Sequence, residues 1–135
     1  MMEEMAEPVQ QSYLMWIFTA LGFKYALLLP LSALVSFFVT LLVVIRGKGP
    51  AAAAAVLLLV PIPFLVGLVG ALDGTTASFA VIAHSSVAPK PSELAQGISM
   101  ALVAPWLGLT LMAPTFLLAT IGMVVKALIG EAKPK

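Results

Sequence analysis

The chain has 135 residues, of which 61% are hydrophobic and 10% are charged, and its formal net charge is +1. Charged residues make up about a quarter of an ordinary soluble domain, so this composition predicts a membrane protein. Cysteine is absent, which excludes disulfides and zinc–thiolate sites. The balance of seven basic and six acidic residues gives no basic patch for nucleic acid, and we expect no nucleic-acid partner.

The chain begins with a polar tail, residues 1–9, that carries three glutamates. A cleaved secretory signal begins with basic residues, so we expect none here. Residues 10–23 mix polar side chains with Tyr13, Trp16 and Phe18. Such aromatic residues favour the headgroup layer of a membrane, and we expect an interfacial helix over this stretch.

Three apolar stretches follow, and each exceeds the roughly 20 helical residues that cross a bilayer. The first span is expected at 25–45, with a local kink at Pro30. A very short turn at 46–50 joins it to a second span at 51–83, so these two spans form an antiparallel hairpin.

The second span contains Pro61 and Pro63, which membrane helices tolerate when neighbours satisfy the freed carbonyls. An outer loop is expected at 84–92. Ser92 and Glu93 are typical of a helix N-cap followed by an acid in the first turn. The third span is expected at 93–129, followed by a cytoplasmic tail at 130–135, and we find no second domain.

The basic residues indicate the orientation. Arg46 and Lys48 lie between the first two spans, and Lys126, Lys133 and Lys135 lie at the end of the third. Because basic loops stay in the cytoplasm, the turn between the first two spans and the C-terminal end of the third span are predicted to be cytoplasmic. The fold class is therefore an all-α membrane protein with three spans, its N-terminus outside and its C-terminus inside.

Small residues recur three or four apart in the last two spans, which places them on one helix face. Such a face lets a second helix approach closely. The residues are Gly67, Gly70, Ala71, Gly74 and Ser78 in the second span, and Gly97, Ala101, Ala104, Gly108 and Thr115 in the third.

Together, these two patterns and the short outer loop between them resemble the last two transmembrane helices of the MotA/TolQ/ExbB proton-channel family, the ExbB/TolQ branch most closely. Lys24 also matches a basic residue of ExbB-like proteins. The resemblance implies a homopentamer in the bacterial inner membrane. Its central pore encloses single-span partner helices of the ExbD/TolR type, and the assembly acts as a proton-driven stator.

The resemblance also implies which residues have which role. Pore-lining residues are Gly67, Ala71, Gly74, Thr75, Ser78, Ala101, Pro105, Gly108 and Met112, and helix-packing residues are Gly70, Gly97 and Ala104.

The chain departs from the family in three respects. The family has a large cytoplasmic region between the first span and the glycine-rich one, and another after the last, where this chain has a short turn and a short tail. The family also has threonines at the positions of Ala71 and Pro105. Two further readings therefore stay open: a non-conducting oligomeric scaffold, and a ring whose apolar cavity holds lipid.

Asp73 is the one acid inside an apolar span, and burying it unpaired would cost several kcal/mol. Lys24 lies at a similar depth on the neighbouring antiparallel span, so an ion pair between the two is feasible. Snorkelling of each group to the outer interface and direct ion handling by Asp73 are the alternatives. We expect that Asp73→Asn weakens assembly more than it alters transport.

His84 is the single histidine, and we interpret it as an interfacial loop residue. The sequence contains no nucleophile–base pair, phosphate-binding loop or cluster with metal-ligand spacing. We therefore expect neither an enzyme, nor a cofactor, nor a metal site, and membrane lipids are the expected small-molecule contacts.

Overall fold

The computed structural model describes residues 12–131 as four helices. Helix α1 comprises Tyr13–Arg46, α2 Gly49–Leu59, α3 Ile62–Ala83 and α4 Pro91–Glu131. The predicted polar tail at 1–9, the first two residues of the predicted interfacial helix and residues 132–135 lie outside the described residues. Three stretches are long and apolar enough to cross a membrane: Tyr13–Arg46, Gly49–Ala83 and Pro91–Gly130. The expected all-helical membrane fold with three candidate spans is confirmed.

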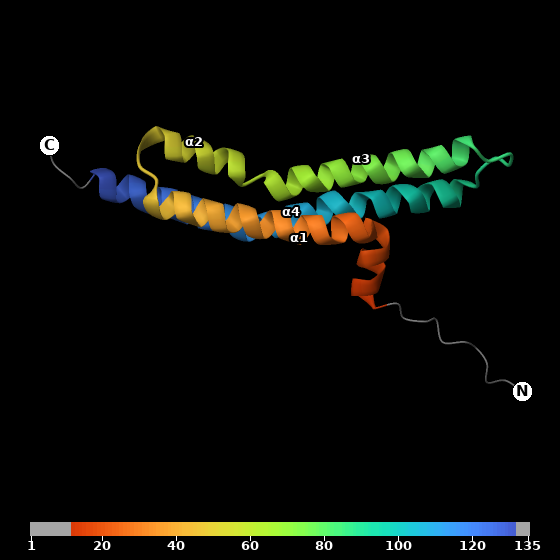
Figure 1. The fold of residues 1–135 in the computed structure, drawn as a ribbon, viewed down its shortest axis with the longest axis horizontal. Coiled ribbons are helices and arrows are strands. Elements are labelled where there is room, and N and C mark those ends of the chain that lie inside the picture. The colour runs from red at the N-terminus through yellow and green to blue at the C-terminus, as the bar shows by residue number, and fades with distance from the viewer. Residues whose placement is uncertain (1–11, 132–135) are drawn as a thin grey trace, which may run out of the picture.

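Helix α1 bends sharply near its start. Gly22 has φ 68° and ψ 157°, and its backbone is the one non-helical point within α1. An L-residue rarely adopts this conformation, whereas glycine does so at little cost. Residues 13–21 therefore form a separate helical segment that turns away from the long axis of the bundle (Figure 1). The sequence did not predict this break at Gly22. Pro30 lies inside α1, and the local kink expected there stays a prediction.

The predicted second span at 51–83 is divided into α2 and α3, with a break at Val60 and Pro61. Pro61 and Pro63 lack the N–H groups that would bond to the carbonyls of Leu57 and Leu59 in a continuous helix. Ser36 of α1 compensates for one of these losses, because its hydroxyl donates to the Leu59 carbonyl over 2.6 Å.

Helix α4 begins at Pro91, slightly before the predicted position. The backbone N–H of Lys90 donates to the Glu93 carboxylate over 3.2 Å. This is the reciprocal half of a capping box, with Lys90 in the N-cap position and Pro91 as the first helical residue. The predicted cap at Ser92 is therefore wrong, and the acid in the first turn is confirmed.

Helix α4 packs against both α1 and α3 along the bundle (Figure 1). It runs parallel to α1, since Gly122 lies against Val44 and the Lys126 ammonium donates to the Gly47 carbonyl. It runs antiparallel to α3, joined by a loop at 84–90. One buried cluster is centred on Leu21, Tyr25 and Leu29 of α1 with Val103 and Ala104 of α4.

A second buried cluster lies toward the opposite end and comprises Val56, Val60 and Ala119. The rest of the surface is unusually apolar, with large exposed side chains on all the long helices, among them Phe23, Leu57 and Val81. Such a surface requires a membrane or protein partner to cover it.

Candidate functional site

Helices α3 and α4 form the most extensive helix contact within residues 12–131, and glycine makes their close approach possible. A Cβ built on Gly67 would lie 2.6 Å from the Ala104 carbonyl oxygen and 2.9 Å from the Pro105 Cα. A Cβ built on Gly108 would lie 2.6 Å from the Pro63 carbonyl oxygen. Because these obstacles are backbone atoms, any side chain at either glycine would force the two helices apart.

Three residues predicted to line a pore lie in the helix contacts of a single chain. Gly67, Ala101 and Gly108 are buried between helices, and their pore role in an assembly stays a prediction. The predicted packing residues have the expected kind of neighbour. Gly70 lies against Ala104 and Tyr25, and Gly97 lies against Ser78.

The other predicted pore residues are partly exposed: Ala71, Gly74, Thr75, Ser78, Pro105 and Met112. The two hydroxyl groups among them bond within their own helix. Thr75 donates to the Ala71 carbonyl over 2.7 Å, and Ser78 donates to the Gly74 carbonyl over 2.9 Å. Each hydroxyl oxygen keeps its acceptor lone pairs for another donor. Their pore role concerns an assembly of chains and stays a prediction.

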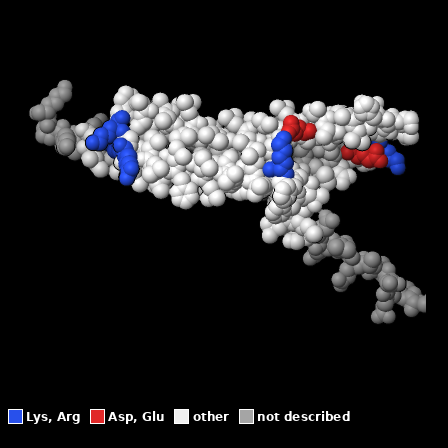
Figure 2. All heavy atoms as spheres, viewed as in Figure 1, with Lys and Arg blue, Asp and Glu red and all other residues white. Residues whose placement is uncertain are grey.

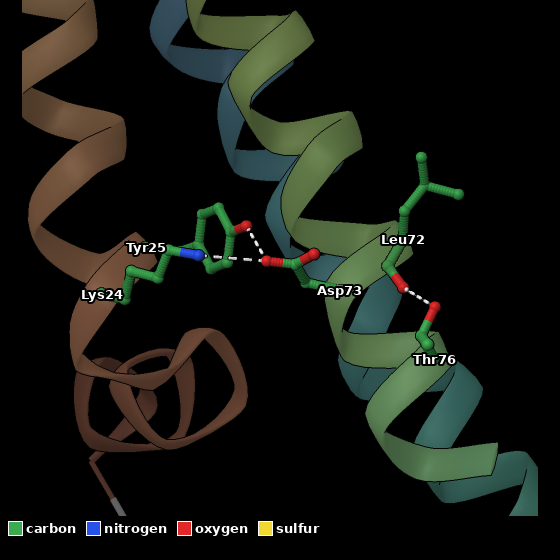
Figure 3. A network of polar contacts seen from close by, with 5 residues as sticks. All are labelled: Lys24, Tyr25, Leu72, Asp73 and Thr76. Carbon is green, nitrogen blue, oxygen red and sulfur yellow. Dashed lines mark hydrogen bonds and ion pairs between the residues drawn. The ribbon is translucent and has the colours of Figure 1, made fainter. Parts of the chain in front are cut away.

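Lys24, Tyr25 and Asp73 form a polar network between α1 and α3 (Figure 3). The Lys24 ammonium lies 3.1 Å from Asp73 Oδ2, as their similar depth in the membrane indicates from the sequence. The Tyr25 hydroxyl donates to the same oxygen. The Lys24 and Asp73 side chains are 71% and 52% exposed, whereas Tyr25 is buried. Tyr25 therefore holds Asp73 from the buried side, whereas the Lys24–Asp73 ion pair lies at the surface of the chain.

A pocket of about 320 Å³ adjoins this network. Its lining includes Tyr25 and Asp73 together with Gly74, Ser78, Gly97 and Ala101. Asp73 thus shares a pocket with residues of both small-residue stripes. Tyr25 was missed by sequence reasoning. The sequence signal that could have identified Tyr25 is its position directly after Lys24, the residue predicted to pair with Asp73.

The charged side chains lie in separate groups along the long axis of the bundle (Figure 2). Arg46, Lys48 and Lys126 gather at one end, the Lys24–Asp73 pair lies further along, and Lys90 and Glu93 lie at the α3–α4 loop. Between these levels the visible surface is formed by uncharged residues.

The described residues contain no group of three or more histidine and acidic side chains that could hold a metal ion. His84 is exposed at the C-terminal end of α3. Within residues 12–131, the groups available for binding are therefore the polar network, the helix hydroxyls and the terminal cations.

The antiparallel pair α3–α4, with its glycine contacts, is the part of the chain that the family resemblance covers. The sequence profile of the MotA/TolQ/ExbB proton channel family matches residues 54–127, more than half of the chain. The chain belongs to the MotA/TolQ/ExbB family. The predicted membership is thereby confirmed, and a proton-channel-type membrane function follows in general terms. No curated protein and no solved structure matches the chain.

The MotA/TolQ/ExbB match extends from within α2, through the break at Pro61, to near the end of α4. It therefore includes both faces of the α3–α4 contact and Asp73. Lys24 and Tyr25, which hold Asp73, lie outside the matched residues.

Proposed function

We propose that this chain is the ring-forming subunit of a proton-driven stator in the bacterial inner membrane, with several copies, five by family resemblance, around single-span partner helices of the ExbD/TolR type. The family match over α3 and α4 is the observation that carries the proposal. In this proposal the partner helix supplies the proton-binding aspartate, and the ring converts the proton motive force into movement of the partner.

The levels of the charged residues support a defined position in the membrane. Lys24 and Arg46 are 22 residues apart on α1, which corresponds to about 33 Å of helix at 1.5 Å per residue. The hydrocarbon core of a bilayer is about 30 Å thick. With Arg46, Lys48 and Lys126 at the cytoplasmic surface, the Lys24–Asp73 pair lies at the outer surface and residues 13–21 lie along the headgroups.

Figure 1 supports the same position, because the 13–21 segment leaves the bundle at a steep angle. Tyr13 and Trp16 stack in this segment, and aromatic residues of this kind prefer the headgroup layer. An outer membrane surface at the height of the Lys24–Asp73 pair therefore also places the 13–21 segment in the headgroup layer.

The exposed apolar faces of α3 and α4 support oligomer formation. Leu68 and Leu72 of α3 and Leu102 and Leu109 of α4 are all exposed, and neighbouring copies, partner helices and lipid together cover such surfaces in a ring. The passage for protons then depends on the acceptor oxygens of Thr75 and Ser78. Ala71 and Pro105, at the family's threonine positions, contribute no hydroxyl.

The absence of hydroxyl groups at Ala71 and Pro105 favours one alternative, a ring that holds its partner or lipid but does not conduct protons. The turn between α1 and α2, only two residues long in the structure, is consistent with this alternative, because the family's large cytoplasmic region is missing at this point.

Native mass spectrometry of the tagged protein, extracted gently from its own host's membranes, tests the proposal. A pentamer mass with one or two copies of a small single-span protein is expected, together with proton flux in vesicles that contain both. A bare ring, or a ring that holds only lipid and passes no protons, contradicts the stator function and supports the scaffold.

The orientation has its own test, since the chain has no cysteine. Ser86→Cys, in the exposed α3–α4 loop, is expected to react with a membrane-impermeant maleimide in intact spheroplasts. Lys48→Cys is expected to react only after the membrane is permeabilised. The reverse pattern overturns the proposed orientation.

A further inference from the structure

An apolar groove runs between α2 and α4 at the end of the bundle that carries the cations. Its volume is about 420 Å³, and its lining includes Ala53, Val56 and Leu57 of α2 and Met112, Phe116 and Met123 of α4. Thr120 is its one hydroxyl-bearing lining residue, and this hydroxyl donates to the Phe116 carbonyl within α4. The groove therefore suits an apolar occupant.

The dimensions of the groove match one leaflet of a membrane. Met112 and Met123 are 11 residues apart on α4, or about 16 Å along a helix. Half of the hydrocarbon core is about 15 Å thick. An acyl chain of one leaflet can thus lie in the groove over its whole depth.

Cations lie where the headgroup of such a lipid would be. Lys48 is the N-cap residue of α2, five residues before Ala53, and Lys126 is three residues after Met123. Lys126 also donates to the Gly47 carbonyl, which holds the ammonium beside the α1–α2 turn. Basic pockets between helices on the cytoplasmic side are the sites that anionic lipid headgroups prefer.

A second copy of the chain is a less suitable occupant of this groove than an anionic lipid. Rotation about an axis along the membrane normal keeps each residue at its own depth. A neighbouring copy would therefore bring its own Arg46, Lys48 and Lys126 to the same level. Asp73 pairs with Lys24, and Glu93 caps α4 at the α3–α4 loop, so both acids lie toward the opposite end. Glu131 follows Lys126 by more than a helical turn, and Lys133 and Lys135 come after it in the sequence.

We propose that the α2–α4 groove binds one acyl chain of an anionic phospholipid, with the lipid phosphate held by Lys48 and Lys126. The assignment to the inner leaflet rests on the orientation proposed above, whereas binding itself needs neither a partner helix nor proton flux. The lipid covers apolar surface at the break between α2 and α3 and brings a negative charge to the level of Arg46, Lys48 and Lys126.

The test compares two lipids that differ only in the headgroup. The purified oligomer is delipidated in detergent, mixed with palmitoyl-oleoyl phosphatidylglycerol or the phosphatidylcholine with the same acyl chains, and examined by native mass spectrometry. Wild-type protein is expected to retain phosphatidylglycerol preferentially. Lys48→Gln is expected to lower that retention about fivefold, the contribution of one lysine near an anionic surface. Lys90→Gln removes the same charge at the opposite end and is expected to leave retention unchanged.

Thr120→Trp fills the groove from an exposed position and is expected to lower retention of both lipids while the oligomer mass stays the same. Equal retention of the two lipids by the wild type, or an equal effect of Lys48→Gln and Lys90→Gln, overturns the proposal. Crosslinking between chains through Thr120→Cys in native membranes would also overturn it, because a second copy would then occupy the groove. Failure to find a partner helix would contradict the stator function alone.

Discussion

Ser36 of α1 donates its hydroxyl to the Leu59 carbonyl, the group that Pro63 leaves without a helical partner. Ser36 is fully buried, and no water in the hydrocarbon core can replace it. The bond thus ties α1 to the break between α2 and α3. It allows the second span to contain two prolines in close succession without an unpaired carbonyl at Leu59.

Ser36→Ala is therefore expected to destabilise the folded chain by about 1–3 kcal/mol, the usual cost of leaving a buried polar group unpaired. Ser32→Ala is the matched control, because the Ser32 hydroxyl donates to the Leu29 carbonyl within α1. Unfolding in mixed micelles with increasing SDS measures both variants. Equal stability of the two variants would show that the bond to Leu59 has no structural weight.

Gly67→Ala is expected to separate α3 from α4 and to destabilise the protein by about 1–3 kcal/mol, as overpacking generally does. Gly74→Ala is the control on the same helix, because its new Cβ would lie 3.6 Å from the nearest neighbour, the Ala101 Cβ. This variant is expected to be neutral or slightly stabilising. The same SDS titration measures both, and a Gly67→Ala protein as stable as the wild type would refute the tight helix contact.

Asp73→Asn is expected to weaken assembly more than it alters transport, because it removes the charge that Lys24 pairs with. The fraction of oligomer in mild detergent measures assembly, and Glu93→Gln is the control for loss of an acid elsewhere. The exchange of the two charges, Lys24→Asp with Asp73→Lys, is expected to restore assembly. An assembled Asp73→Asn variant that has specifically lost proton flux would instead identify Asp73 as an ion-handling group.

Gly22→Ala is expected to change the angle of the 13–21 segment, since the φ of Gly22 is +68° and an alanine in this conformation costs about 1–3 kcal/mol. A Cβ at this position meets no atom within 4 Å, so the effect is on the backbone alone. In a Trp106→Phe background, Trp16 is the remaining tryptophan, and quenching by brominated lipids reports its depth. Unchanged quenching in Gly22→Ala would contradict the prediction.

Much of the fold follows from the sequence because lipid imposes strict rules. Long apolar stretches give the spans, and glycines three or four apart give the helix faces that meet. Proline positions are less informative alone. Pro30 lies within α1 without a break in helical geometry, whereas Pro61 lies at the break that divides α2 from α3. The difference is the neighbouring environment, which includes a second proline and the Ser36 hydroxyl.

The site was harder to derive from the sequence. Helical spacing identifies which residues share a face but gives no information about which neighbour the face meets. The pore roles of Gly67 and Gly108 came from the family resemblance, and the structure shows that both glycines pack against backbone within the chain. The contact of Lys24 with Asp73 depended only on comparable depth and could be predicted. Tyr25 required knowledge of the rotation of α1 toward α3.

Helix α3 continues for ten residues beyond Asp73 to Ala83, about 15 Å of helix, and α4 returns over the same height. In the position proposed above, with Asp73 at the outer membrane surface, the upper part of this hairpin would stand in the outer compartment. A ring of such hairpins, as proposed, would form a collar above the lipid. A partner helix would therefore first meet protein walls that include Thr75 and Ser78, before it reaches the depth of the acyl chains.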